Sequence, residues 1–248
     1  MIERQIEIVT PDGRMNTFIC HPERDSPHPA IIFFMDAPGI REELRDMVRR
    51  LGTVGYYVML PNLYYRANVE ELGPLVGEAA VATRQKALHF MTTINIPMVM
   101  QDVDALLAFS AQDEAALHGP MGCVGYCMSG QYAINAAVRH KERIRAAASI
   151  YGVALVTDKP DSPNLAPQRT DARLYFGCAE NDSYAPQVMI DRLRAELTAK
   201  GSNAEVEIYP GAAHGFAFPS RGVYDKPAAE RHWERLFALF GTALKRTQ

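Results

Sequence analysis

Short apolar segments alternate with segments of helical periodicity along most of this 248-residue chain. The clearest apolar runs are residues 30–35, 56–60 and 122–126, which lack the polar alternation of a half-exposed strand. Such runs are typical of strands buried on both faces of a parallel sheet. Further strands are predicted at residues 4–9, 15–20, 146–151, 174–178 and 205–209. Helices are predicted at residues 41–51, 78–91, from Pro97 onward, and at 130–140, 186–200 and 230–244. The order predicts an α/β fold, with a mostly parallel central sheet flanked by helices on both faces.

The length and composition fit one soluble globular domain. Hydrophobic residues make up 48% of the chain and charged residues 22%, which is the balance of a protein with a substantial core. We therefore expect a single domain over residues 1–248. Residues 62–96 contain several glycines and one helical patch, and are predicted to form an excursion over the active site.

Charge and hydropathy argue against several classes of partner. The formal net charge is −3, which provides no basic field for nucleic acid or for an anionic membrane. No apolar run approaches the roughly 20 residues that span a bilayer. The first residues are charged where a signal peptide is apolar, and the four cysteines do not form a disulfide framework in a chain of this length. We expect a cytoplasmic monomer with reduced thiols.

The segment GYCMSG at residues 125–130 lies between an apolar strand and a helix rich in small residues. A nucleophile on a sharp strand-to-helix turn needs small residues two positions before and after it. Gly125 and Ser129 satisfy this rule around Cys127. Ser129 itself fails the rule, because Gln131 is too large. The other cysteines lack this setting and are interpreted as packing residues: Cys20, Cys123 and Cys178. No cluster of metal ligands accompanies them.

A cysteine nucleophile needs a base, and the base needs an orienting acid. His214 lies in a glycine-rich loop after the last predicted strand, which is the position of the base in α/β-hydrolases. Asp182 follows the preceding strand and is the favoured acid, with Glu180 as the alternative. An aspartate there is also a common helix cap. The order nucleophile, acid, base predicts an α/β-hydrolase triad.

The sequence resembles the dienelactone hydrolase (carboxymethylenebutenolidase) family over nearly the whole chain. The matching motifs are MDAPG at residues 35–39, PNLY at 61–64, GYCMSG at 125–130, YG at 151–152 and AHGF at 213–216. The resemblance implies hydrolysis of a dienelactone in the breakdown of chlorinated aromatic compounds, with neither metal nor cofactor.

The resemblance also implies further site residues. The backbone N–H groups of Ala37 and Met128 would form the oxyanion hole, and Asp36 stands where the family has a glutamate that pairs with the resting thiol. Of the two family arginines that bind the substrate carboxylate, Arg84 matches the first. The second falls on Phe218, with Arg221 as a nearby candidate, and Met91 replaces a family tryptophan. Tyr151 is a further candidate for substrate binding.

The predicted substrate is a small activated ester or an enol lactone, cleaved through a thioester of Cys127. Two alternatives remain open. One is a general carboxylesterase or thioesterase of the same fold, and the other is a non-catalytic ligand-binding homologue.

Overall fold

The computed structural model describes residues 1–199 and 203–244. The chain forms two compact units, Met1–Met121 and Gly122–Gln248, and each is described by itself. The expectation of one domain over residues 1–248 stays a prediction.

The first unit contains four strands in the order β1-β2-β4-β3. β1 (Ile2–Thr10) and β2 (Gly13–His21) form an antiparallel hairpin. β2 is also antiparallel to β4 (Tyr57–Pro61), whereas β3 (Ala30–Phe34) pairs with β4 in parallel. Every residue of β3 and β4 is buried. These wholly apolar sequences therefore suit central strands, as predicted.

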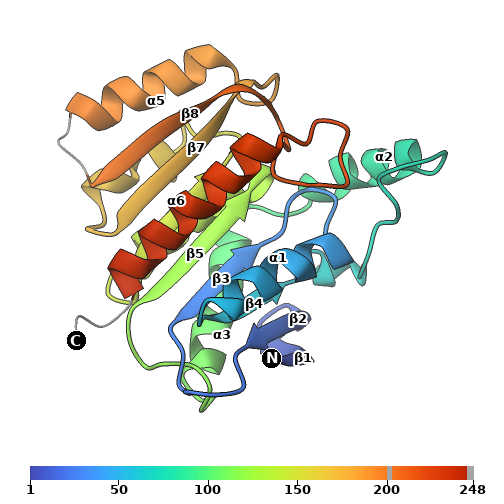
Figure 1. Ribbon diagram of the computed structural model, residues 1–248, viewed down its shortest axis with the longest axis vertical. Coiled ribbons are helices and arrows are strands. Elements are labelled where there is room, and N and C mark those ends of the chain that lie inside the picture. Colours follow the sequence, from blue (N-terminus) through green and yellow to red (C-terminus); the bar gives the residue numbers. More distant parts are fainter. Residues whose placement is uncertain (200–202, 245–248) are drawn as a thin grey trace. The chain divides into compact units, whose positions relative to one another are not determined.

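The helices of the first unit are α1 (Glu42–Thr53), α2 (Ala80–Met91) and α3 (Ile96–Ser110). α1 packs against β2 and β4, and α3 packs against β1 (Figure 1). Asn95 begins α3 because its side-chain oxygen accepts the N–H of Met98 at 3.0 Å, and proline is tolerated in the first turn that follows. Between β4 and α2 the chain forms one short 3₁₀ turn, η1 (Tyr65–Ala67).

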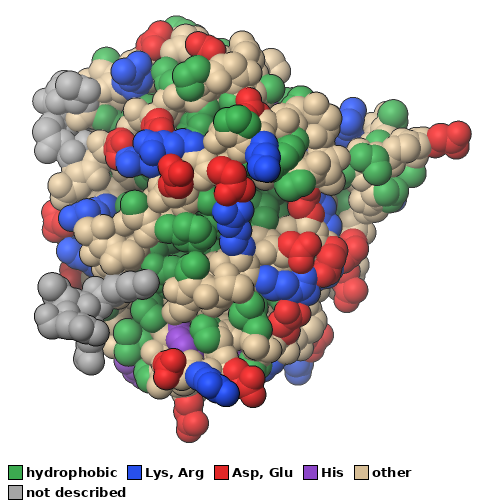
Figure 2. Space-filling view, in the orientation of Figure 1, with side chains coloured by type: hydrophobic (Ala, Val, Ile, Leu, Met, Phe, Trp, Pro, Cys, Tyr) green, Lys and Arg blue, Asp and Glu red, His purple; other side chains and the backbone are tan. Residues whose placement is uncertain are grey.

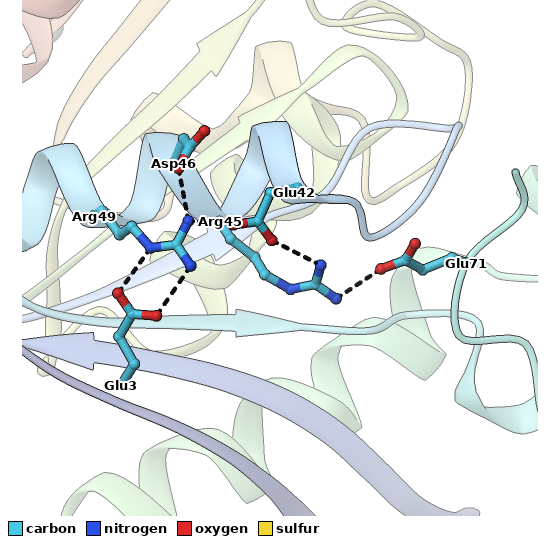
Figure 3. A network of polar contacts seen from close by, with 6 residues as sticks. All are labelled: Glu3, Glu42, Arg45, Asp46, Arg49 and Glu71. Atoms are coloured by element: carbon cyan, nitrogen blue, oxygen red, sulfur yellow. Dashed lines mark hydrogen bonds and ion pairs between the residues drawn. The ribbon is translucent and has the colours of Figure 1, made fainter. Parts of the chain in front are cut away.

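Ion pairs connect α1 with segments on either side of it (Figure 3). Arg49 donates to both carboxylate oxygens of Glu3 on β1, at 2.8 and 3.0 Å. Arg45 bonds to Glu42 on its own helix and to Glu71 in the segment before α2, at 3.2 and 2.8 Å. Because the carboxylates are largely exposed, each pair stabilises the unit only modestly.

The second unit carries strands in the order β5-β6-β7-β8. These strands are β5 (Met121–Tyr126), β6 (Ile144–Ile150), β7 (Arg173–Asn181) and β8 (Ala204–Ala213). The pairs β6/β7 and β7/β8 are parallel. The carboxyl ends of these parallel strands meet at one edge of the sheet, so the loops that follow them are brought together.

The described part of this unit contains three α-helices: α4 (Gly130–Arg139), α5 (Gln187–Ala199) and α6 (Lys226–Leu244). α4 packs on β6, and α6 contacts β6 and β7 while crossing in front of the strands in Figure 1. The apolar residues predicted to share one side of this helix are buried at Trp233, Leu236, Phe240 and Leu244, whereas Phe237 is half-buried. The described residues also form the 3₁₀ segments η2 (Cys127–Ser129) and η3 (Pro163–Gln168).

The predicted boundaries differ from the structure mainly at two places. β8 continues four residues beyond the predicted end at residue 209, through a proline and a glycine that were expected to break it. α6 begins at Lys226 instead of 230, because Asp225 caps it by accepting the N–H of Ala228 at 3.0 Å. Lys200, the predicted last residue of the helix at 186–200, lies outside the described residues.

The surface carries charges of both signs. On the face shown in Figure 2, acidic and basic side chains are interspersed. Among the described residues, no helix is both long and apolar enough to cross a bilayer. Within the same ranges, no three His, Cys, Asp or Glu side chains converge in a way that could hold a metal ion.

Candidate active site

The backbone reverses sharply at Cys127, between the end of β5 and the start of α4. Cys127 has a φ of +55°, a left-handed conformation that costs a non-glycine residue about 1–2 kcal/mol. A Cβ atom on Gly125 would lie 2.0 Å from the carbonyl oxygen of Ser129. Only glycine therefore fits two residues before the turn, as the spacing rule predicts.

Close packing beneath the turn holds it against β6. A Cβ atom on Gly130 would lie 2.2 Å from Oγ of Ser149, and one on Gly152 would lie 2.1 Å from the same atom. The carbonyl of Cys127 also accepts the N–H of Val153 at 3.2 Å. These contacts compensate for the strained backbone and keep the start of α4 directly behind Cys127.

The predicted acid and base are hydrogen-bonded to each other. Nδ1 of His214 lies 2.7 Å from Oδ2 of Asp182, whose side chain has no exposed surface. An ionised carboxylate only accepts hydrogen bonds, so Nδ1 carries the proton and Nε2 is left for the thiol. Oδ1 of Asp182 accepts the N–H groups of Tyr184 and Ala185, at 2.8 and 3.1 Å. Asp182 thus stabilises the turn before α5 and orients His214 at the same time.

The imidazole of His214 also hydrogen-bonds the side chain of Cys127. Burial alone would lower the pKa of His214, but the hydrogen bonds to Asp182 and Cys127 outweigh it and raise the pKa to about 9. The imidazolium form is therefore favoured at neutral pH. Such a cation beside a sulfur stabilises a thiolate.

The other cysteines have a different environment. Cys127 is partly exposed, whereas Cys20, Cys123 and Cys178 are buried, and all four are free thiols. Burial raises the pKa of Cys20 to about 11 and that of Cys178 to about 12, and raises the pKa of Cys123 further. These thiols are protonated at neutral pH and shielded from reagents. Ser129, the alternative nucleophile, has no exposed surface.

Aromatic rings surround the imidazole. The buried Tyr151 ring lies 5.1 Å from that of His214, and the Tyr184 ring, on a residue that is 63% exposed, lies 4.9 Å from it. Phe218 is fully buried against Tyr151, and the guanidinium of Arg221 lies over the Phe218 ring at 4.6 Å.

Arg221 also reaches the backbone beside the base. Its Nη1 atom lies 2.7 Å from the position that a Cβ atom on Gly215 would take, directly after His214. The structure therefore brings three predicted substrate-binding residues close to the base: Tyr151, Phe218 and Arg221.

The remaining candidates, apart from Met128, belong to the first unit. Asp36 has no exposed surface, and its Oδ1 lies 2.5 Å from Nη1 of Arg41. The carbonyl of the neighbouring Ala37 accepts the hydroxyl of Tyr64 at 2.8 Å. Arg84 is exposed on α2. The roles expected of Asp36, Ala37 and Arg84 stay predictions, as does the oxyanion-hole role of Met128, which is buried in η2.

Two features near the base were missing from the sequence prediction. One is the contact of the Tyr184 ring with His214, for which the signal was an aromatic residue two positions after the predicted acid. Glu180, the alternative acid, bonds elsewhere: its Oε2 accepts the N–H of Gly211 at 2.7 Å. Asp182 is therefore the carboxylate on the imidazole.

Comparison with known proteins shows the family of the chain. A family model described as "Dienelactone hydrolase family" matches residues 15–244. A relative from Methylorubrum extorquens, named "Putative carboxymethylenebutenolidase", is 26% identical over 98% of this chain and 83% of its own length. A relative from Escherichia coli K12 with the same name is 28% identical over 88% of this chain and 78% of its own.

Solved structures are similar over the same extent. The structure titled "Crystal Structure of Putative Dienelactone Hydrolase from Klebsiella pneumoniae subsp. pneumoniae MGH 78578" superposes with a TM-score of 0.83. It covers 97% of this chain and 98% of its own, at 23% identity. The predicted α/β-hydrolase fold is confirmed.

Proposed function

Because the chain belongs to the dienelactone hydrolase family of ester- and lactone-cleaving hydrolases, we propose that it hydrolyses small activated esters or enol lactones through a thioester on Cys127. The observation that carries this proposal is the position of one partly exposed sulfur. Cys127 lies on a strained turn and is hydrogen-bonded to a histidine that Asp182 orients. The other three thiols are buried.

The reaction begins with attack of the Cys127 thiolate on the carbonyl carbon, which forms a carbon–sulfur bond and an oxyanion. The backbone N–H groups of Met128 and Ala37 are the proposed oxyanion donors. The oxyanion then collapses and expels the alkoxide or enolate, which takes a proton from His214. Water next attacks the thioester with His214 as base, releasing the carboxylic acid and the free cysteine.

A sulfur nucleophile restricts the substrate. A thiolate leaves more readily than an ordinary alkoxide, so the tetrahedral adduct of a plain alkyl ester mostly returns to reactants. An enol ester, enol lactone or aryl ester expels a stabilised anion, and forward collapse then competes with return. We therefore expect activated esters to be favoured over alkyl esters, and amides to be poor substrates.

Arg221 is the proposed contact for an acidic substituent of the substrate. Family members hold the lactone carboxylate with two arginines, and Phe218 occupies the second position here. The Arg221 guanidinium lies over the Phe218 ring, 4.6 Å from its centre, and beside Gly215. An arginine displaced by three residues thus lies near the base, where a guanidinium can bind a carboxylate through two hydrogen bonds.

Substitution of the nucleophile tests the proposal. Cys127→Ala is expected to abolish turnover of p-nitrophenyl acetate and of an enol lactone, and to remove the one thiol that iodoacetamide labels in the folded protein. Cys20→Ala, which removes a buried thiol of the first unit, is the matched control and keeps activity and labelling. Turnover by Cys127→Ala within about tenfold of the wild type would refute a covalent role for this sulfur.

A substrate panel separates this proposal from a general carboxylesterase or thioesterase. Dienelactone isomers, aryl acetates, alkyl acetates and acyl-CoA thioesters are compared by kcat/KM. Preference for acyl-CoA or for plain alkyl esters would favour the alternatives. Labelling of Cys127 without turnover of any member of the panel would favour a non-catalytic homologue.

A further inference from the structure

Three consecutive side chains at the end of β7 bond to the segment that carries the base. Oε2 of Glu180 accepts the N–H of Gly211 at 2.7 Å, and Nδ2 of Asn181 donates to the carbonyl of Gly211 at 3.1 Å. Asp182 then accepts from His214. The N–H and the carbonyl of Gly211 are thus both hydrogen-bonded by side chains at the end of β7, which also leads into Asp182.

The regular backbone ladder is interrupted at this place. β7 and β8 pair residue by residue up to Ala179 and Tyr209, and the next pair is Asn181 with Ala213. β7 advances by two residues between these pairs and β8 by four, so β8 bulges at residues 210–212. Gly211 in the bulge has a φ of +73°, which suits glycine.

The bulge determines where His214 lies. The register pairs no β7 residue with residues 210–212, and both backbone polar groups of Gly211 bond to side chains of β7. His214 follows the bulge by two residues. A strand bulge next to an active site commonly directs a side chain. Here the two bonds to Gly211 fix the bulge to the same strand end as Asp182, so acid and base share one support.

We propose that Glu180 and Asn181 are positioning residues for His214, acting as a two-sided clamp on Gly211; the inference rests on the proposed function of the triad. Neither side chain acts on substrate in this scheme. Both act through the backbone of the β8 bulge. The clamp keeps Nδ1 of His214 at hydrogen-bond distance from Asp182 and its Nε2 directed at the thiol.

The test uses the full chain and two readouts. One is the rate of Cys127 alkylation by iodoacetamide as a function of pH, which reports the thiolate and requires no ester turnover. The other is kcat and KM for p-nitrophenyl acetate. Glu180→Ala and Asn181→Ala are each expected to lower kcat about threefold to tenfold with KM little changed, since each loses one exposed hydrogen bond. Each also slows the alkylation of Cys127 at neutral pH.

Conservative and control variants make the result specific. Glu180→Gln keeps an oxygen that accepts the N–H of Gly211, and is expected to retain wild-type alkylation and kcat. Gln187→Ala removes an exposed hydrogen bond to Asp191 on α5 and leaves both readouts unchanged. The proposal is overturned if the two alanine variants lower only the melting temperature, or if Glu180→Gln is as impaired as Glu180→Ala.

Failure of the proposed function is distinguishable from failure of the clamp. If the wild type hydrolyses no ester, the alkylation profiles still report whether Glu180 and Asn181 hold His214 against the thiol. If the wild type is active and the alanine variants are indistinguishable from it in both readouts, the triad stands and the clamp is wrong.

Discussion

At the scale of single residues, Cys127 and His214 form a pair whose properties come from its neighbours. The φ of +55° lifts the sulfur out of the strand direction, and Asp182 fixes the tautomer of the imidazole. Burial and the two hydrogen bonds act on the pKa of His214 in opposite directions, and the bonds prevail. A thiol with these neighbours is a stronger nucleophile at neutral pH than a buried one.

Tyr184 is exposed, and its ring lies 4.9 Å from the imidazole of His214. The leaving oxygen must reach His214 to receive its proton, so the leaving group lies beside the imidazole and the Tyr184 ring. We predict that Tyr184→Ala lowers kcat/KM for phenyl acetate about threefold to tenfold, because an aromatic contact is lost. The kcat/KM for hexafluoroisopropyl acetate is expected to change much less, because its leaving group has similar acidity but no ring.

The comparison of the two esters decides what the ring does. Tyr184→Phe keeps the stacking surface and is expected to retain the preference for the aryl ester. An equal loss of kcat/KM for both esters in Tyr184→Ala would contradict the prediction. It would mean that the ring acts on His214 and not on the leaving group.

At the scale of elements, local pattern predicted the strands and most helices well. The apolar runs of β3, β4 and β5 are wholly buried, and the glycine spacing at residues 125–130 identified the turn. The ends of β7 and β8 were missed because Glu180 and Gly211 carry no apolar signal. Their pairing is a contact across 31 positions of sequence, which periodicity cannot reveal.

The prediction of site residues shows the same difference between local patterns and contacts across long stretches of sequence. Residues with a local motif, such as Cys127 and His214, could be predicted from short segments. The sequence indicated Arg221 only as a nearby candidate for substrate binding, because its approach to Gly215 depends on the path of the loop between β8 and α6. Tyr184 was overlooked for the same reason, since its contact with His214 joins two different loops.

The turn at β5 and the helix α6 provide a matched pair of glycines. Gly125→Ala places a methyl group 2.0 Å from a backbone oxygen, which no side-chain movement relieves. We expect it to destabilise the fold by about 3 kcal/mol or more. Gly241→Ala in α6 meets no atom within 4 Å, and is expected to stabilise by about 0.5–1 kcal/mol through helix propensity.

Thermal and urea unfolding of both variants check this prediction. Gly125→Ala is expected to melt well below the wild type or to be recovered only unfolded, whereas Gly241→Ala melts slightly above it. A folded Gly125→Ala protein with the wild-type melting temperature would show that the turn tolerates a side chain, and would remove the steric basis of the spacing rule here.

At the scale of the whole molecule, the three residues of the proposed triad lie in one of the two compact units. Cys127, Asp182 and His214 follow β5, β7 and β8 of the unit Gly122–Gln248. The parallel pairing of β7 with β8 is therefore what brings acid to base. Global unfolding separates these three side chains together, so the ionisation of the site is coupled to the stability of the fold.

That coupling predicts how stability depends on pH. The pKa of His214 is about 9 in the folded protein against an ordinary value of 6.5, a rise that corresponds to about 3 kcal/mol. Because the folded pKa is the higher one, this stabilisation is fully present below pH 6.5 and is lost as the pH rises through about 9. His214→Gln removes it.

Urea unfolding of the wild type and His214→Gln between pH 6 and 10 measures this contribution. The difference in unfolding free energy is expected to be largest near pH 6 and to shrink steadily toward pH 10. His118→Gln, at an exposed position of the first unit, controls for the general effect of removing a histidine. A His214→Gln difference that grows with pH would mean that the imidazole is neutral in the folded protein, and that the thiol has no cationic partner.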